Sequence, residues 1–593
     1  MNNINEDKLA VGFITAGDSI NISGQLRKSD ENATPEITQR DFLTFTQHDP
    51  IKLTNSLVYC RPTLVMNQST LDAENPGYYA VQRSWTTDED LQLGVTDVLL
   101  EKSSFWTFEA EVIAVIEFPI GSTEPIAVMT ELDRGPVFNT QIFKCNDLSE
   151  IPTGGLPTSK AGYVYRTNIP ALLYLLDNKL LNQDARHKGF FGKTGCGKSH
   201  MVASEFVRYL DTEMSFCVFE PKLQIINGEL GTSKNFRKRI KETGRELLPI
   251  YLDQFQIKPD IHSFKNLVNT NNLWDSKYVR KMKKGDKVQA TDVFADIIFD
   301  EQKKSYQQWM QGDMSDIDFL KNVLQELVDN HMQRIYAPGN ARTELEGSIR
   351  ALLNNNSKLK SMARNLIKVK FLFAEKKNVK TIDEIVDNFL LGHKTITYII
   401  PKFKEVNNLF KKDDFDAIYK FLVSKIIEKV ENHCSYPVGK YKNIKQFNVC
   451  FVIDEAQRLF PSGNTDNFSG DERKTIEKFY QMLETYRSKG ISAWLATPDP
   501  MTINEKIRKR IFDHDLYVGS KLTSAGAKEI KDQITNPNRY KDLINMPSPT
   551  HEFDSKEGVS KMKNFHFFLK GRLNPLDTRD EGFILRIDLE DHS

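Results

Sequence analysis

The sequence lacks paired cysteines. Its six cysteines are scattered over 593 residues, and none forms a C-x-x-C pair. This spacing argues against a disulfide framework and against a zinc ribbon, and it suits a reducing cytosol. Histidine is also scarce, with 11 residues, none of which is paired with carboxylates at metal-ligand spacing. We therefore find no nuclease site, and any cutting of nucleic acid would belong to a partner.

Long apolar runs are missing as well. The amino terminus, MNNINEDKLAVGF, has neither the basic segment nor the sustained apolar segment of a secretory signal. No later run approaches the roughly 18 apolar residues needed to cross a bilayer. We expect a cytoplasmic protein without a membrane partner.

Net charge is zero, but it is unevenly distributed. Residues 1–150 hold 10 Lys and Arg against 23 Asp and Glu, a net charge of −13, which leaves 70 against 57, or +13, for residues 151–593. An acidic first part suits a protein partner, and a basic remainder suits a polyanion. An ordinary solvated surface explains the same counts equally well.

A phosphate-loop motif is present. The chain from Lys188 to Tyr209 reads KGFFGKTGCGKSHMVASEFVRY, which predicts a strand, a loop over Gly192–Ser199 and a helix. The spacing G-x-x-x-x-G-K-[ST] is typical of such loops, because glycines let backbone N–H groups approach a polyphosphate closely. We expect Lys198 to reach the β and γ phosphates of ATP, and Ser199 to bind Mg²⁺.

Polar residues end three further predicted strands. The apolar run Gln446–Ile453 is followed by Asp454 and Glu455. Beside a phosphate loop this pair predicts hydrolysis, with Asp454 holding Mg²⁺ through water and Glu455 polarising the attacking water. Glu220 and Thr497 end two other strands, so we expect Glu220 near the nucleotide and Thr497 as a γ-phosphate sensor.

The chain divides into four predicted parts. Residues 1–150 contain short β-rich runs broken by turns, which favours a small barrel or sandwich. Residues 151–224 begin an ATPase core, residues 225–390 form an inserted helical subdomain, and residues 391–593 complete the core and end in a strand pair. Basic clusters in the insertion, such as Arg280–Lys284, are usually solvated faces, although a motor can use them against phosphates.

Four motifs carry a resemblance to a known family. They are Arg186-His187 before GKTGCGKS, the strand end Val218–Pro221, the segment VIDEAQRLFP from Val452 to Pro461, and RSKGISAWLATPDP from Arg487 to Pro500. With this layout the chain resembles the HerA branch of the HerA/FtsK ATPases. The resemblance implies an α/β fold with a RecA-like P-loop ATPase core, an amino-terminal β-barrel and an inserted helical subdomain. It covers nearly the whole chain, but only the four motifs are specific.

The resemblance also implies partners and further site residues. It implies a homohexameric ring that binds ATP between subunits and threads double-stranded DNA. An effector, such as a nuclease or a sirtuin-like NADase, would dock on the barrel face, as in antiphage defence assemblies. Two arginines are implied at the γ-phosphate, with Arg186 acting across the subunit interface and Arg487 within its own subunit.

The sequence departs from the family at two positions. Gln457 replaces the histidine of DEAH, and Pro498 replaces the glutamine of ATQ. Proline has no N–H and no side-chain amide, so γ-phosphate sensing is weakened or moves to Thr497. The catalytic candidates are Lys198, Asp454, Glu455, Arg186, Arg487 and Thr497. The candidates for binding ATP and Mg²⁺ are Gly192, Lys193, Thr194, Gly195, Cys196, Gly197, Lys198, Ser199, His200, Glu220 and Asp454.

Three functional hypotheses follow. The first is an ATP-driven DNA translocase ring with a partner effector. The second is an ATP-binding scaffold that assembles and gates an effector with little translocation, which Pro498 and the neutral net charge favour. The third, a conjugative or secretion pump ATPase, is disfavoured by the lack of a membrane segment.

Overall fold

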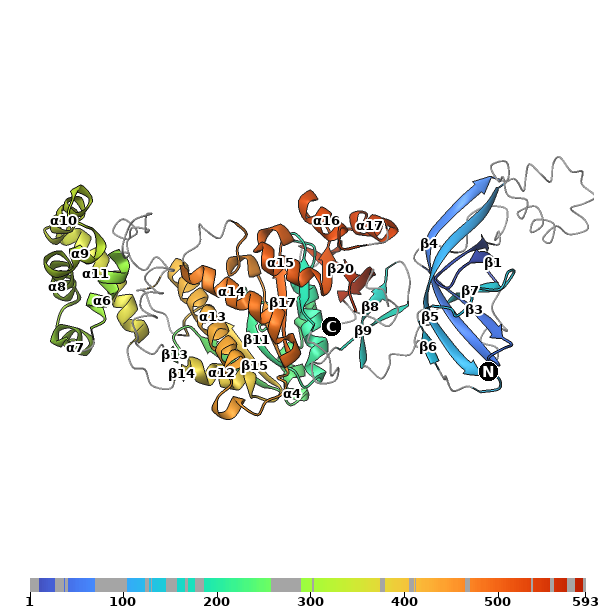
Figure 1. Ribbon diagram of the computed structural model, residues 1–593, viewed down its shortest axis with the longest axis horizontal. Helices are drawn as coiled ribbons and strands as arrows, with labels where there is room; N and C mark the ends of the chain where they lie inside the picture. The colour runs from blue at the N-terminus through green and yellow to red at the C-terminus, as the bar shows by residue number, and fades with distance from the viewer. Residues whose placement is uncertain are drawn as a thin grey trace, which may run out of the picture. The chain divides into compact units, whose positions relative to one another are not determined.

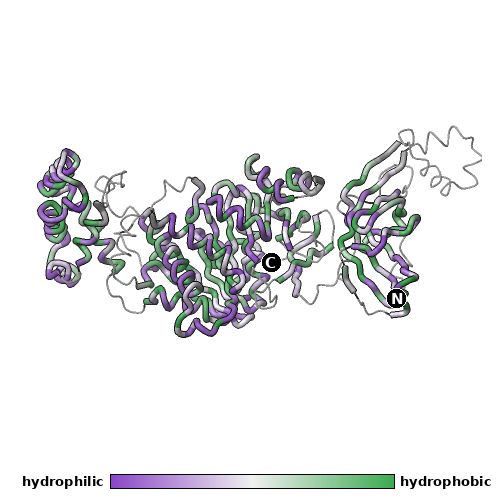
Figure 2. The backbone as a smooth tube through the Cα atoms, viewed as in Figure 1, coloured by the Kyte–Doolittle hydropathy of each residue, from purple (hydrophilic) through white to green (hydrophobic). Residues whose placement is uncertain are grey.

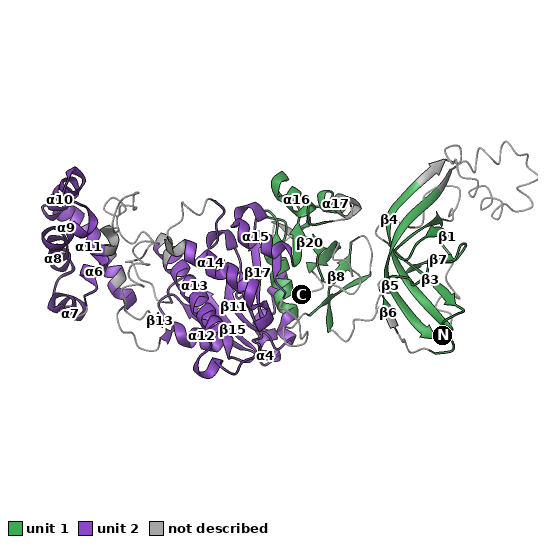
Figure 3. Cartoon of the chain, in the orientation of Figure 1, with its two compact units in different colours: residues 1–176, 190–208, 514–593 green, residues 177–189, 209–513 purple. Residues whose placement is uncertain are grey.

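The computed structural model forms two compact units, which Figure 3 colours separately. Unit 1 comprises residues 1–176, 190–208 and 514–593, and unit 2 comprises residues 177–189 and 209–513. The structure describes residues 10–26, 37, 41–69, 104–122, 127–129, 131–145, 157–165, 169–175, 186–256, 290–300, 303–373, 379–404, 410, 412–463, 470–534, 537–554, 559–572 and 582–589.

The first part of unit 1 is a closed β-barrel (Figure 1). Six antiparallel strands run in the order β2-β1-β7-β3-β4-β5, the pairing of β2 with β5 closes the circle, and β6 adds to β5. The strands are β1 (Gly12–Gly17), β2 (Asn21–Leu26), β3 (Phe42–Asp49), β4 (Thr54–Ser69), β5 (Ser104–Pro119), β6 (Ala127–Met129) and β7 (Gln141–Cys145). Closure leaves these six strands without a free edge.

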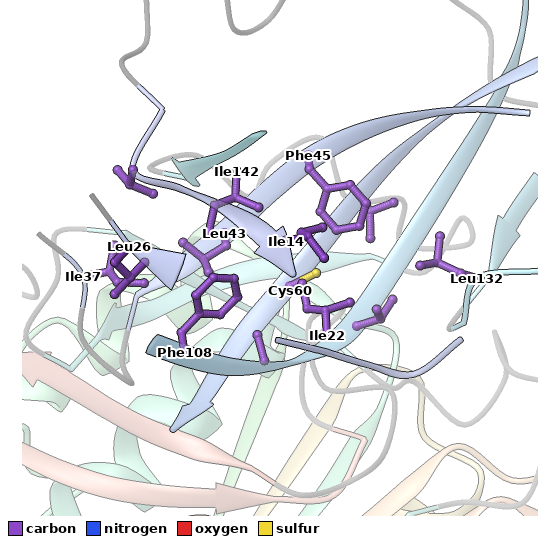
Figure 4. Packing of buried hydrophobic residues seen from close by; sticks show 14 of the residues in the cluster. Ile14, Ile22, Leu26, Ile37, Leu43, Phe45, Cys60, Phe108, Leu132 and Ile142 are labelled. Carbon is purple, nitrogen blue, oxygen red and sulfur yellow. The ribbon is translucent and has the colours of Figure 1, made fainter. Parts of the chain in front are cut away.

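Apolar side chains fill the barrel (Figure 4). Ile14, Phe45 and Phe108 come from three different strands and are at most 1% exposed. Alternation along each strand places such residues on one face, where the closed sheet excludes water. The β-rich character predicted for residues 1–150 is thus a barrel, as the family resemblance implied.

The rest of unit 1 contains a second, antiparallel set of strands. Their order is β18-β20-β21-β8-β9, with β10 next to β18 and with β19 paired with β20. Two helices, α16 (Ser524–Lys531) and α17 (Pro537–Ile544), accompany them. The predicted terminal pair is present as β20 and β21, with Asn564 opposite Asp588. The bounds are β8 (Thr158–Val164), β9 (Pro170–Tyr174), β10 (Lys188–Phe191), β18 (Asp515–Gly519), β19 (Thr550–Asp554), β20 (Val559–Lys570) and β21 (Phe583–Asp588).

Unit 2 is built on a buried sheet in the order β12-β15-β11-β16-β17-β10. The pairs from β12 to β17 are all parallel. The strands β11, β15, β16 and β17 are buried along their whole length, because parallel sheets are covered on both faces. The bounds are β11 (Ser215–Phe219), β12 (Glu246–Tyr251), β15 (Thr395–Ile400), β16 (Val449–Ile453) and β17 (Ile491–Thr497).

Helices cover this sheet. Helix α12 packs on β11 and β15, α14 packs on β17, and α13 lies between α12 and α14. The helices of this layer are α4 (Phe236–Glu242), α12 (Ile382–Leu390), α13 (Lys412–Ser435), α14 (Gly470–Thr485) and α15 (Glu505–Phe512). A covered parallel sheet whose strand β10 leads into a phosphate loop makes the core RecA-like, so the predicted α/β fold class is confirmed.

A helical subdomain interrupts unit 2. Hydrophilic and hydrophobic residues alternate along its helices, as expected for amphipathic helices (Figure 2). They are α6 (Ala290–Ile298), α7 (Lys304–Gln311), α8 (Asp316–Glu326), α9 (Met332–Ile335), α10 (Asn340–Leu353) and α11 (Asn356–Phe373), with a π-helical turn at Leu327–His331. The range 225–390, expected to be helical, also contains α4 and the sheet strand β12, and a short pair, β13 (Phe255–Gln256) with β14 (Lys380–Thr381). In the part of the chain that the structure describes, no helix has the length and apolar character that crossing a membrane requires.

Candidate active site

The phosphate loop lies in unit 1, between β10 and α3 (Lys198–Arg208). Gly195 and Gly197 have φ values of 84° and 92°, which residues with a side chain rarely adopt. A Cβ atom on Gly197 would lie 2.7 Å from the ring of Phe565. The loop therefore needs glycine at this position for both its backbone conformation and its close packing.

Lys198 and Ser199 occupy the first turn of α3. The helix begins with the bond from Met201 N–H to the carbonyl of Gly197, at 2.9 Å, and its first turn contains no acidic residue. The first N–H groups of a helix have no partner within it, and they lie at the positive end of the helix dipole. Together with the Lys198 cation they form an arrangement suited to a phosphate group.

Cys196 and His200 contribute no charge to this loop. The side chain of Cys196 is 1% exposed, and burial raises the pKa of its thiol, so it stays protonated at neutral pH. Burial lowers the pKa of His200 to about 4, and its ring lies 5.7 Å from that of Phe565. Both predicted binding residues thus pack against the protein with their side chains. Lys193 and Thr194, in contrast, are exposed.

The two carboxylates lie in unit 2, after β16. Asp454 is held at the strand end, because its N–H donates to the carbonyl of Phe219, at 2.9 Å, on the neighbouring strand β11. Its side chain is mostly buried and accepts a 3.0 Å hydrogen bond from the N–H of Glu455. Glu455 has φ 56° and ψ 44°, a left-handed conformation that is uncommon for a residue with a side chain. Such strained residues concentrate at functional sites.

Two neighbours hold the side chain of Glu455. The ammonium of Lys222 lies 2.8 Å from Oε1, and the amide of Gln457 donates to Oε2. The ion pair with Glu455 raises the pKa of Lys222. Sequence reasoning missed Lys222, although a signal existed: it follows β11 closely, and the carboxyl ends of neighbouring parallel strands meet at one edge.

Glu220 is an internal carboxyl group. It is 1% exposed and accepts hydrogen bonds from the N–H groups of Gln224, at 2.7 Å, and Ile225, at 3.2 Å, and from the hydroxyl of Tyr398. The pKa of Glu220 is raised to about 7, chiefly by burial and in smaller part by the negative charge of Asp454. Glu220 therefore lies close to Asp454, but its oxygens serve the protein's own donors. Its predicted contact with the nucleotide stays a prediction.

Thr497 also bonds within the protein. It ends β17, is fully buried, and its hydroxyl lies 2.7 Å from that of Thr502. Asp499 fixes the same turn by accepting a 2.9 Å hydrogen bond from the N–H of Met501. The turn that contains Pro498 is therefore stabilised by its own hydrogen bonds.

Arg186 and Arg487 lie near a buried histidine. Nε2 of His187 donates to the carbonyl of Leu483 at 2.8 Å, and Nδ1 accepts from the N–H of Ala493 at 3.1 Å. The pKa of His187 is lowered to about 3, chiefly by burial and in smaller part by the positive charges of Arg487 and Arg186. His187 is thus a neutral structural residue with both arginines around it.

This placement separates the arginines from the carboxylates of unit 2. Arg487 precedes β17, whereas Thr497 ends it and Asp454 ends the parallel strand β16. A seven-residue strand is about 23 Å long at about 3.3 Å per residue. Arg487 therefore lies at the edge of the sheet opposite to Asp454 and Thr497, and its predicted action within its own subunit stays a prediction.

Similarity to known proteins is limited to solved structures. No family model matches this chain, and no curated protein does. The solved structures similar to it include VirB4 of Thermoanaerobacter pseudethanolicus, which is 11% identical with a TM-score of 0.37, covering 74% of this chain and 98% of that one. They also include the bacterial conjugative coupling protein TrwBΔN70 with sulfate (12%, TM-score 0.32, covering 72% and 88%) and the pCW3 conjugation coupling protein TcpA with ATPγS (10%, TM-score 0.24, covering 93% and 89%). With TM-scores this low, we draw no functional conclusion from these neighbours.

Proposed function

We propose that this protein is a HerA-type ATPase that forms a ring and moves double-stranded DNA. One observation carries the proposal: a glycine loop that places Lys198 and Ser199 at a helix start occurs in the same chain as a buried strand that ends in Asp454 and Glu455. A cation at a helix start suits a triphosphate, and a carboxylate pair at a strand end suits Mg²⁺ and water activation.

The residues present fit ATP with Mg²⁺. Gly197 leaves no room for a side chain where the loop must wrap the phosphates. The Ser199 hydroxyl would ligate the metal directly, and Asp454 would hold it through water. When bound, Mg²⁺ neutralises phosphate charge and aligns the γ-phosphate for attack.

Glu455 is proposed to orient the attacking water and accept its proton. A carboxylate can do this only if its lone pairs point toward the water, and here Lys222 and Gln457 fix the orientation of the group. Lys222 is therefore a positioning residue that acts through Glu455.

Arg186 and Arg487 are proposed to neutralise charge on the γ-phosphate of a neighbouring subunit. An arginine in this role contributes about 10³ to 10⁵ in rate. Both lie at the sheet edge away from Asp454, so a contribution across a ring interface is the geometry that suits them.

The acidic barrel is proposed to dock an effector protein, such as a nuclease or a sirtuin-like NADase of an antiphage assembly. The net charge of −13 over residues 1–150 supports a protein partner here, since it would repel DNA. The hexameric state and the defence role rest on the family resemblance.

A scaffold with little translocation is the second candidate. The buried, hydrogen-bonded hydroxyl of Thr497 and the presence of Pro498 favour it, because neither offers a free donor to a γ-phosphate.

The rate of ATP hydrolysis with and without duplex DNA distinguishes the two candidates. A translocase is stimulated by DNA, whereas a scaffold hydrolyses ATP at a rate indifferent to it. Lys198→Ala should abolish hydrolysis and weaken ATP binding, and Glu455→Gln should bind ATP but fail to turn it over. Near-normal hydrolysis by Lys198→Ala would exclude this loop as the active site.

A further inference from the structure

Helix α11 of the inserted subdomain presents an unusual basic face. From Gly347 to Ala374 the chain contains six basic residues and no Asp or Glu. Four of them, Arg350 at the end of α10 and Lys358, Lys360 and Arg364 on α11, are exposed. We call these four residues the α11 basic face. The cluster Arg280–Lys284, noted in the sequence, lies outside the described residues.

Three cations of this subdomain have carboxylate partners. Arg334 pairs with Asp296 at 2.6 Å, Arg342 with Glu346 at 2.7 Å, and Lys368 with Asp414 at 2.8 Å. Within the described ranges, no member of the α11 basic face forms an ion pair. Its charge therefore remains available to an external anion.

The position of these cations is unfavourable for the helix itself. The Asn355 side chain caps α11 by accepting the N–H of Lys358 at 3.1 Å, which places Lys358 in the first turn. Cations near this end oppose the positive helix dipole, and Lys360 and Arg364, four positions apart, repel each other. Helix α8 follows the opposite and favourable rule, with Asp316 and Asp318 in its first turn.

Basic residues that lower the stability of their own helix indicate selection for something other than folding. We propose that the α11 basic face binds the phosphate backbone of double-stranded DNA. This proposal deepens the proposed function and rests on it, since it names the surface that contacts the DNA.

The geometry and chemistry of the face suit a phosphate backbone. Lys360 and Arg364 lie one turn apart on the same side of α11, about 6 Å along the helix, and Lys358 lies at the other flank of its exposed side. Exposed Ser357 and Ser361 add hydroxyl donors between the cations. These side chains contact phosphates without reading bases, as a sequence-independent motor requires.

The test measures binding of the full-length protein to a fluorescently labelled DNA duplex over a range of salt concentrations, with a non-hydrolysable ATP analogue present. For Lys360→Gln/Arg364→Gln we expect weaker binding and a salt slope reduced by about 2, since each phosphate contact contributes about 0.9. The matched control is Lys304→Gln/Lys321→Gln, which removes two charges from α7 and α8 of the same subdomain. It should bind DNA as the wild type does.

A second variant separates binding from folding. Lys358→Glu places an acid in the first turn of α11, so it should raise the thermal midpoint or leave it unchanged while weakening DNA binding. A structural role for Lys358 predicts the opposite, a lower midpoint.

The remaining outcomes overturn the proposal in distinguishable ways. If the wild type binds DNA and the α11 variants bind equally well, only this inference fails. If the wild type binds no DNA, the translocase function fails with it. If the variants change ring mass instead of DNA affinity, the face is a contact between subunits.

Discussion

At the scale of single residues, Glu455 has an uncommon backbone conformation and a side chain that is held by its neighbours. It combines a left-handed φ of 56° with side-chain bonds to Lys222 and Gln457. A carboxylate on such a strained backbone keeps its direction only while these partners remain.

We therefore expect Lys222→Met to lower the kcat of ATP hydrolysis by about 10- to 100-fold, the cost typical of a misplaced catalytic group. The KM for ATP should change little, because the proposed role of Lys222 is to position Glu455 and not to bind ATP. Lys222→Arg should keep part of the rate, since its guanidinium can still pair with the carboxylate. Steady-state kinetics checks this, and a rate for Lys222→Met at or above the wild-type rate would show that the ion pair restrains Glu455.

Glu220 makes stability depend on pH. Its pKa of about 7 lies above the ordinary value of 4.5, chiefly because the group is buried. Between these two values the folded state holds the proton more tightly than the unfolded state, so the contribution of Glu220 to stability falls as pH rises. At about 1.4 kcal/mol per pKa unit, the penalty reaches about 3 kcal/mol above pH 7.

Glu220→Gln removes this titration. The free energy of unfolding of this variant, relative to the wild type, should rise by about 3 kcal/mol from about pH 4.5 to pH 7. Urea denaturation across this range measures the difference, with Glu246→Gln, a change at an exposed carboxylate on β12, as the control. A difference that stays constant with pH would contradict the assignment.

At this scale the sequence predicts the motif residues but not the residues that hold them in position. The spacing around Lys198 and Asp454 predicts a loop and a strand end, which are local features. Lys222 and His187 contact residues distant in sequence, so these contacts depend on the order of the strands in the sheet, which local spacing alone does not give.

At the scale of secondary-structure elements, the buried strands were the most predictable. The runs at β11, β15, β16 and β17 are continuous and apolar, which is typical of a covered parallel sheet. Strand β12 was missed because Pro249 interrupts its pattern and several of its side chains are partly exposed. Its place at the end of the strand order explains both features, since an edge strand tolerates proline.

Strand direction was an unused signal. In a parallel sheet, residues before a strand lie at the amino edge and residues after it lie at the carboxyl edge. Arg487 precedes β17 and Thr497 ends it, so the chain order alone separates the two.

At the scale of the whole molecule, chain order does not follow spatial grouping. Residues 190–208 group with residues 514–593 in unit 1. Phe190 stacks on Tyr517 with ring centres 4.6 Å apart, and the Tyr517 hydroxyl donates to Glu205 at 2.8 Å. The prediction of one continuous segment, 151–224, could not anticipate this grouping, because the contacts join residues about 300 positions apart.

The proposed ring makes a prediction about mixed subunits. Arg186 and Arg487 lie around His187, and Arg487 precedes the strand that Thr497 ends. If each arginine completes the site of a neighbour, Arg186→Ala and Arg487→Ala subunits should be inactive alone, as Lys198→Ala subunits are. Mixing either arginine variant with Lys198→Ala should then restore ATP hydrolysis, because some interfaces pair an intact arginine with an intact phosphate loop.

The expected recovery is a fraction of wild-type activity. An active interface needs the intact loop of an arginine-variant subunit on one side and the intact arginine of a Lys198→Ala subunit on the other. When the two kinds of subunit are equal in number and mix at random, at most one interface in four meets this condition. Native mass spectrometry must first show that mixed rings form. An arginine that acts within its own subunit gives no recovery, because each mixed subunit then carries either a broken loop or a missing arginine. Recovery with Arg186→Ala and none with Arg487→Ala would mean that Arg487 acts within its own subunit. It would then do so although about 23 Å of strand separate it from the carboxyl edge of the sheet.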